Sequence, residues 1–198
     1  MKKYVTKALD ETTWSDFERL AEAHQGVWGG CWCMWYHAKD KTQDDSPAAR
    51  RAAKECRVRE GRAHAALVFH GEECVGWCQF GSPEELPRLH NQRAYEAGQS
   101  KLPDWRITCF FAGKGFRGDG VAAIALEGAI DQIRKLGGGR IEGYPEDIEG
   151  RKVAPAFLFN GALSTFERMG FKRDRLIGKY KWVVTRTVRG VPIAASRK

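Results

Sequence analysis

"AGKGFRGDGVAAIALEGAI", residues 112–130, places four of its five glycines and two cations, Lys114 and Arg117, directly before a run with helical periodicity. Glycines let the backbone turn tightly and leave its N–H groups open to a ligand. The unpaired N–H groups at a helix start carry about half a positive charge, which favours an anion. We therefore expect this turn to bind a phosphate group.

The segments on either side of the turn predict its place in the fold. "WRITCFFA", residues 105–112, is rich in β-branched and aromatic residues and predicts a strand buried on both faces. From Ala122 the apolar residues repeat with helical spacing, and Gly137 follows the expected last turn. The order is therefore a strand, a phosphate-binding turn and a helix.

A strand, two helices and a hairpin are predicted upstream. "YVTKAL" (4–9) predicts a first strand and "TTWSDFERLAEAH" (12–24) a helix. A second, basic helix over residues 44–61 begins with Ser46 as its N-cap. Residues 64–81, "HAALVFHGEECVGWCQFG", predict an antiparallel hairpin.

The remaining segments complete a mixed sheet. Residues 82–104 hold three prolines and predict a surface insertion of the kind that can cover a site. "RIEGYP" (140–145) predicts another strand, and "NGALSTFERMGF" (160–171) a short helix with Asn160 as its N-cap. Terminal strands are expected over residues 176–188. Together these elements predict an α/β fold in which helices flank a mixed, mostly antiparallel sheet.

The composition predicts one globular domain. The chain has 198 residues, 42% of them hydrophobic, and we expect residues 1–188 to form that domain and residues 189–198 a flexible tail. The N-terminus has no apolar signal segment, and no apolar run is long enough to cross a bilayer, which predicts a cytoplasmic protein with no membrane partner. Its six cysteines are then expected to be thiols.

The charge balance indicates an anionic partner. The chain carries 33 basic and 25 acidic residues, for a net charge of +8, and six of the basic residues cluster in residues 49–62. That cluster is either a solvated helix face or a surface for an anion. Charge alone does not choose between a nucleic acid, an acidic protein and a polyphosphate cofactor.

Two phosphate-binding motifs overlap in the turn. Gly113, Gly115 and Gly118 spell G-x-G-x-x-G between a strand and a helix, and Glu142 follows on the next strand, as in a dinucleotide site. Against this, the unit lies in mid-chain behind an antiparallel hairpin, and Arg117 stands where close helix packing favours a small residue. A site for NAD(P) is kept as an alternative.

In the other frame, residues 117–122 spell R-x-x-G-x-A. This loop resembles that of the GNAT acetyltransferase superfamily, whose R/Q-x-x-G-x-G/A loop joins the fourth strand to the next helix and holds the pyrophosphate of acetyl-CoA. The element order is similar to the family's over residues 3–185, most of all over residues 105–171. The resemblance implies a GNAT-like fold, with acetyl-CoA or another acyl-CoA as co-substrate and no metal.

The resemblance also implies which residues bind the cofactor. Those of the phosphate turn would be Arg117, Gly118, Asp119, Gly120, Val121 and Ala122, with the Asp119 side chain directed away from the phosphate. Those that pair with the pantetheine arm through their backbone, as an added strand does, would be Phe110, Phe111 and Ala112. Asn160 would lie near the same arm. The implied reaction is direct acyl transfer, in a ternary complex, to an amine of a small molecule or peptide, and a homodimer is an open expectation.

An amine attacks a thioester only in its neutral form. For an amine with a pKa near 10.4, neutrality at pH 7 costs about 4.6 kcal/mol, so a base is expected. Glu142, central on the 140–145 strand, is the candidate base, and a surface ion pair is the alternative for it. Tyr144 shares its strand face by the two-residue period and is the candidate proton donor or pocket residue.

One position departs from the family pattern. Where many members carry a tyrosine that protonates the leaving thiolate, this sequence has Phe166, which has no hydroxyl. Tyr144, Tyr180 or water would take that role, or the thiolate would leave unassisted. Cys109 could carry the acyl group as a nucleophile, or it could be a small buried hydrophobe.

The aromatic stretch "GVWGGCWCMWYH", residues 26–37, lies where the family borders its acceptor pocket. The candidate pocket residues are Trp32, Trp35 and Tyr36, with Trp28 beside them and core packing as the alternative. Three further residues invite a zinc site, although C-x-C lacks a matching second pair: Cys31, Cys33 and His37.

A different class of function stays open. On the same fold, a non-catalytic protein could use the basic helix of residues 50–62 to bind RNA or an acidic partner. Such a protein would bind RNA with an affinity that falls steeply as salt is added, and CoA would not stabilise it.

Overall fold

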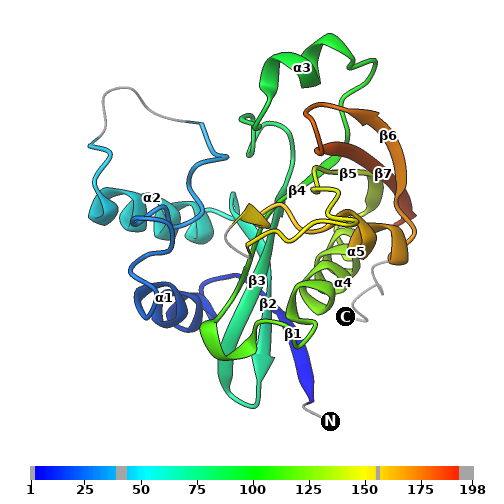
Figure 1. The fold of residues 1–198 in the computed structure, drawn as a ribbon. Helices are drawn as coiled ribbons and strands as arrows, with labels where there is room; N and C mark the ends of the chain where they lie inside the picture. Colours follow the sequence, from blue (N-terminus) through cyan, green and yellow to red (C-terminus); the bar gives the residue numbers. More distant parts are fainter. Residues whose placement is uncertain (1–2, 39–43, 155–156, 192–198) are drawn as a thin grey trace.

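A seven-stranded sheet forms the centre of the fold, in the strand order β1-β2-β3-β4-β5-β7-β6 (Figure 1). The computed structural model describes residues 3–38, 44–154 and 157–191. Its strands are β1 (Tyr4–Ala8), β2 (His64–His70), β3 (Glu73–Gly81), β4 (Trp105–Ala112), β5 (Gly138–Gly143), β6 (Lys172–Leu176) and β7 (Trp182–Arg189). Its helices are α1 (Trp14–Glu22), α2 (Pro47–Arg59), α3 (Gln92–Ala97), the 3-10 turn η1 (Lys114–Phe116), α4 (Val121–Lys135) and α5 (Leu163–Arg168). The predicted mixed, mostly antiparallel sheet with flanking helices is confirmed.

β4 and β5 are the parallel pair of the sheet, and they separate partway along their length. All other neighbouring strands pair antiparallel. β4 pairs with β5 only over residues 105–107, opposite residues 141–143. Over residues 108–112, β4 stays paired with β3 but is paired with no other described strand. This open edge presents backbone N–H and C=O groups to its surroundings.

The two faces of the sheet carry separate cores, because side chains alternate across a strand. Trp77 of β3 lies in the core beneath α1 and α2, and its neighbour Cys78 lies in the core beneath α4 and α5. On the first side the rings of Phe17 and Trp77 pack with centroids 4.8 Å apart. On the second, Leu126 and Ile133 of α4 are fully buried. Figure 1 shows these two helix pairs on either side of β2 and β3.

Local signals set the ends of α2 and α4, but not the start of α5. Ser46 Oγ accepts a hydrogen bond from Ala49 N at 3.2 Å and caps α2 as predicted. Gly137, with φ of +106°, follows the last turn of α4. The N-cap of α5 is Ala162, so the prediction that Asn160 caps this helix is wrong. The Asn160 side chain is instead held in a buried polar network near β4.

The insertion of residues 82–104 is anchored on the sheet. It contains α3, and Tyr95 of this helix is fully buried. Arg106 of β4 donates a hydrogen bond to the Leu86 carbonyl at 2.7 Å. The segment is therefore a packed cover over this end of the sheet.

The terminal strands begin earlier than predicted. β6 starts at Lys172 and consists mainly of charged residues, so it has no alternating apolar pattern. As the last strand of the sheet it is exposed along one edge, where charge discourages pairing with another chain. None of the described helices is both long and apolar enough to cross a membrane.

Candidate active site

The turn before α4 exposes its backbone. Gly118 and Gly120 have φ of +88° and +81°, a left-handed conformation that residues with a Cβ rarely adopt. Gly120 is the N-cap of α4, and as a glycine it has no side chain with which to cap the helix. The first N–H groups of a helix have no backbone partner one turn before them, and residues 118–120, which lead into the helix, are exposed, whereas Val121 is buried. This is an arrangement that suits an anion.

The charged side chains of the turn lie on different sides of it. Arg117 Nε donates to the Ala112 carbonyl at 3.3 Å, which keeps the guanidinium at the end of β4. Asp119 Oδ2 accepts from the Tyr4 hydroxyl at 3.3 Å, so this carboxylate is held toward β1. The positive charge thus lies beside β4 and adds to that of the helix start.

A groove of about 840 Å³ begins at this turn. That volume is within the range of cofactor and ligand sites. Its apolar walls come from the end of β4, the loop after α1, and residues 158–159. Its lining residues include Trp28, Phe110, Phe111, Leu158 and Phe159, together with the cations Lys114, Arg117 and Arg168. The groove therefore joins an apolar channel to a positively charged mouth.

The open edge of β4 is partly occupied by the chain itself. Phe110 N donates to the Phe159 carbonyl at 2.7 Å. Backbone groups alternate in direction along a strand, so Ala112 faces the same side as Phe110. The Phe111 carbonyl instead faces β3, where an added Cβ on Gly76 would lie 2.6 Å from it. Of the three residues expected to pair with a pantetheine arm, two face the open edge and Phe111 faces away from it.

Asn160 lies at the separation of β4 from β5 and is 2% exposed. Its Nδ2 donates to the Tyr36 hydroxyl at 2.7 Å and to the Thr108 carbonyl. Its Oδ1 accepts from Lys181 Nζ at 3.0 Å, and Lys181 also pairs with Glu146 at 2.9 Å. Burial raises the pKa of Tyr36 well above its usual value, so its hydroxyl stays protonated at neutral pH.

Glu142 is fully buried, so the surface position in the alternative for it is wrong, although it does form an ion pair with the partly exposed Arg140. Its Oε2 accepts from the hydroxyls of Tyr95 at 2.8 Å and Tyr144 at 3.3 Å. Its Oε1 lies 3.1 Å from an Arg140 nitrogen, outside hydrogen-bond geometry. Burial raises the pKa of both tyrosines. Glu142 does not line the groove, and the insertion covers it through Tyr95.

The aromatic loop after α1 divides between core and groove. Trp32 is 5% exposed and stacks on Trp14 with ring centroids 6.5 Å apart, so it belongs to the core and not to the pocket expected of it. Trp28 is 54% exposed and lines the groove. Trp35 stacks on His90, with centroids 3.8 Å apart and ring planes 1° apart.

Two of the three residues considered for zinc, His37 and Cys33, have other side-chain partners. His37 Nε2 lies 3.0 Å from Gln79 Nε2, and Cys33 Sγ lies 3.2 Å from Cys109 Sγ. Within residues 3–38, 44–154 and 157–191, no group of three His, Cys, Asp or Glu side chains could hold a metal ion.

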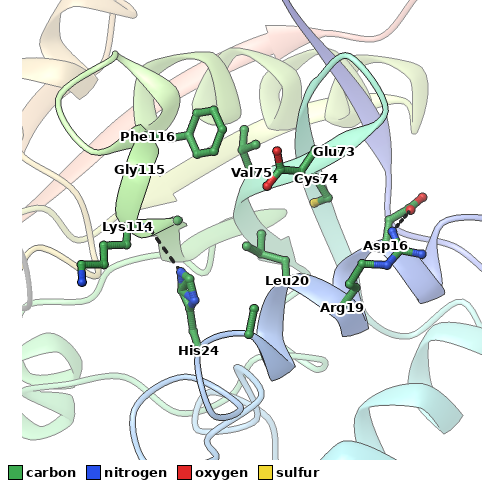
Figure 2. Close-up of a pocket in the computed structure, with 12 residues that line it drawn as sticks. Asp16, Arg19, Leu20, His24, Glu73, Cys74, Val75, Lys114, Gly115 and Phe116 are labelled. Carbon is green, nitrogen blue, oxygen red and sulfur yellow. Dashed lines mark hydrogen bonds and ion pairs between the residues drawn. The ribbon is translucent and has the colours of Figure 1, made fainter.

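A second pocket of about 320 Å³ adjoins the groove. Figure 2 shows His24 pointing toward Lys114, whose N–H donates to His24 Nε2 at 3.2 Å. Burial, with the charge of Arg117, lowers the pKa of His24, which favours the neutral ring that accepts this bond. His24, Lys114 and Phe116 line both pockets. The sequence does not identify His24 as a groove residue, and its only signal is the helical spacing from Leu20.

Solved structures of acetyltransferases share this fold, although no family model and no curated protein matches the sequence. An acetyltransferase from Thermus thermophilus has a TM-score of 0.52 at 12% identity, over 94% of this chain and 97% of its own. A Corynebacterium glutamicum protein described as histone acetyltransferase HPA2 and related acetyltransferase has a TM-score of 0.52 at 14% identity, over 95% and 98%. A Desulfovibrio desulfuricans protein assigned to the GNAT family has a TM-score of 0.52 at 11% identity, over 93% and 99%. The chain has the fold of the GNAT acetyltransferases.

Proposed function

We propose that this protein is an acyl-CoA-dependent N-acyltransferase, which transfers an acetyl or other acyl group directly to an amine in a ternary complex. The observation that carries the proposal is the glycine-rich N-terminus of α4, which lies beside the apolar groove along β4. This arrangement occurs on a fold that the chain shares with acetyltransferases.

The groove suits the chemistry of coenzyme A from one end to the other. The diphosphate would lie on the N–H groups of residues 118–122, with Arg117 beside it. The pantetheine arm would follow the open edge of β4 and bond to Ala112 and Phe110. Because the Phe159 carbonyl already accepts from Phe110 N, this segment would have to release that bond when the arm enters. The bound thioester supplies the acyl group.

The proposal keeps Glu142 as the base, but acting through hydroxyls. The carboxylate is enclosed by Tyr95 and Tyr144, which are buried as well and do not line the groove. An amine that reaches one of these hydroxyls would pass its proton to that tyrosine while the tyrosine gives its own proton to Glu142. The raised pKa of each tyrosine keeps both hydroxyls protonated, so each holds a hydrogen bond to the carboxylate before the transfer. Phe166 is fully buried against Gly143, and because its ring has no hydroxyl it cannot protonate the leaving thiolate.

The two alternatives find less support. Three arginines of the basic helix form ion pairs within the chain, and Lys54 is fully buried, so less positive surface is left for RNA. The ion pairs are Arg50 with Asp45, Arg51 with Glu18 and Glu55, and Arg59 with Glu55. A nicotinamide dinucleotide would need Glu142 to reach a ribose, and this carboxylate is covered by Tyr95.

The test is thermal stabilisation and calorimetric titration with CoA, NAD(P) and RNA in parallel. A ligand present at 100 times its Kd stabilises the folded state by about 2.7 kcal/mol, which raises the Tm by several degrees in a chain of this size. We expect this from CoA, and we expect CoA release with acetyl-CoA when a library of amines is screened. Stabilisation by NAD(P) alone, or salt-dependent RNA binding without any effect of CoA, would contradict the proposal.

Arg117→Glu supplies the matched variant. It reverses the charge beside the turn and should weaken CoA binding by at least about 100-fold. Arg134→Glu makes the same change in net charge at the opposite end of α4, where Arg134 pairs with exposed Asp131, and should leave CoA affinity within about twofold. Equal effects of the two variants would mean that CoA responds only to overall charge.

A further inference from the structure

Two thiols meet between the loop after α1 and the centre of the sheet. Cys33 Sγ lies 3.2 Å from Cys109 Sγ on β4, although the residues are 76 positions apart. Both are buried, with 2% and 6% exposure. The proposed acyl transfer uses neither thiol, so this contact calls for a separate explanation.

The surroundings of Cys33 stabilise a negative sulfur. Trp77 Nε1 donates to Cys33 Sγ at 3.2 Å. Lys54 of α2 is fully buried, and its Nζ has no hydrogen-bond partner among the described residues. The contact with Cys109, followed by the charge of Lys54 and the Trp77 bond, lowers the pKa of Cys33 against the effect of burial. Burial lowers the pKa of Lys54, and within the described ranges no carboxylate forms an ion pair with it, so a Cys33 thiolate would favour its charged form.

The other cysteines lack this environment. Cys56 is exposed on α2, but its thiol donates to Glu60 at 3.2 Å, and that bond to a carboxylate raises its pKa. Burial raises the pKa of Cys31, Cys74 and Cys78. The cysteine whose pKa is lowered, Cys33, is therefore buried, whereas the pKa of the exposed cysteine, Cys56, is raised.

We propose that Cys33 and Cys109 are a site of oxidative modification, where a hydroperoxide converts the two thiols into a disulfide that joins the loop after α1 to β4. The Cys33 thiolate attacks one peroxide oxygen, the O–O bond breaks, and the departing hydroxide takes a proton to become water. The Cys109 sulfur then attacks the Cys33 sulfenic acid and loses its proton, while the S–O bond breaks and a second water leaves. The two sulfurs lose two electrons, and the peroxide is reduced by two.

The cross-link requires only a short movement. A disulfide has sulfurs about 2 Å apart, so the present contact must close by about 1 Å. Cys109 precedes Phe110, which lines the groove, and Cys33 lies in the same loop as Trp28. The oxidised form would therefore fix the loop on one wall of the groove to the strand on the other.

The experiment treats the full-length, reduced protein with a small excess of hydrogen peroxide. At intervals the remaining thiols are alkylated in denaturant, and the digested protein is mapped by mass spectrometry. We expect a linked Cys33–Cys109 peptide, about 2 Da lighter than its reduced parts, before any oxidation of exposed Cys56. Oxidation of Cys56 while Cys33 and Cys109 remain thiols would overturn the proposal, because exposure alone would then decide reactivity.

Two variants separate the electrostatic cause from simple contact. Lys54→Met keeps the length and burial of the side chain but removes its charge, and it should slow formation of the linked peptide about tenfold at pH 7. Cys78→Ser removes a fully buried thiol of the other core and should leave the rate unchanged. An unchanged rate in Lys54→Met, or loss of the linkage in Cys78→Ser, would count against the assignment.

Discussion

Glu142 is a carboxylate surrounded by phenols. A buried charge is costly unless hydrogen bonds satisfy it, and the hydroxyls of Tyr95 and Tyr144 supply two such bonds. Tyr95 comes from the insertion, so the surroundings of the carboxylate depend on a segment 47 positions away in the chain. For this reason the sequence could place Glu142 on its strand but could not predict that the side chain is enclosed.

Glu142→Gln should lower kcat by about 100-fold, because the amide cannot take up the proton that the tyrosines release. The Kd for CoA should stay within about twofold, since Glu142 does not line the groove. Steady-state kinetics with an amine found by the screen, together with calorimetric titration of CoA, make the comparison. Tyr95→Phe removes one hydroxyl of the relay and should give an intermediate loss. Wild-type turnover in Glu142→Gln would place the base elsewhere.

The tryptophans of the loop after α1 show where single residues escape sequence-based prediction. Trp28 and Trp32 stand four positions apart in a glycine-rich stretch, and their composition gives no basis for separating them. Their different fates follow from left-handed turns, since Val27, Trp28, Trp32 and Cys33 all have φ between +46° and +58°. A backbone with such turns has no regular spacing between side chains on one face. Trp32 therefore lies in the core and Trp28 lines the groove, although nothing in the sequence separates them.

Helix α4 is seated on β3 through a glycine. An added Cβ at Gly76 would lie 2.5 Å from Val121 Cγ1, at the first turn of the helix, and 2.6 Å from the Phe111 carbonyl oxygen. The close approach of strand and helix therefore depends on the missing side chain. It brings the start of the helix and the end of β4 together at the mouth of the groove.

Gly76→Ala should destabilise the fold by about 1 to 3 kcal/mol, because Val121 or the backbone of β4 must move. It should also weaken CoA binding, since the displaced residues belong to the phosphate turn and the groove. Denaturant unfolding and calorimetry measure the two effects. Gly115→Ala is the control: open space surrounds that position, so its stability should change by less than about 0.5 kcal/mol. Equal stability of the two variants would show that the helix tolerates a shift.

Elements governed by neighbouring residues are the ones that the sequence predicts best. Ser46 caps α2, Gly137 follows α4, and the strand, turn and helix of residues 105–135 lie where their composition and spacing place them. The bond from Phe110 to Phe159 and the burial of Tyr95 on Glu142 join segments distant in the chain. Such contacts leave no periodic signal, because they depend on how the elements pack.

Buried histidines link the stability of the whole molecule to pH. His37 is 1% exposed beneath α2, and burial, with the charges of Lys54, Arg57 and Arg62 partly opposed by the Glu85 backbone, lowers its pKa to about 2. His90 is half-buried against Trp35, and burial, with Lys181 and Arg88, lowers its pKa to about 4. Both rings are therefore neutral in the folded protein at pH 5.5, whereas in the unfolded chain they protonate below about pH 6.5.

Lowering the pH from 7.5 to 5.5 should therefore destabilise the protein by about 1.4 kcal/mol through His37 and by nearly as much through His90. The sign follows from the depressed pKa: the unfolded chain binds more protons below about pH 6.5, so this stability is complete above that pH and is lost as the pH falls toward the folded pKa. Urea unfolding at the two pH values measures the change. His37→Gln has no ring to protonate, and the difference between the two pH values should shrink by about 1.4 kcal/mol. An identical pH dependence in this variant would mean that other groups take up the protons.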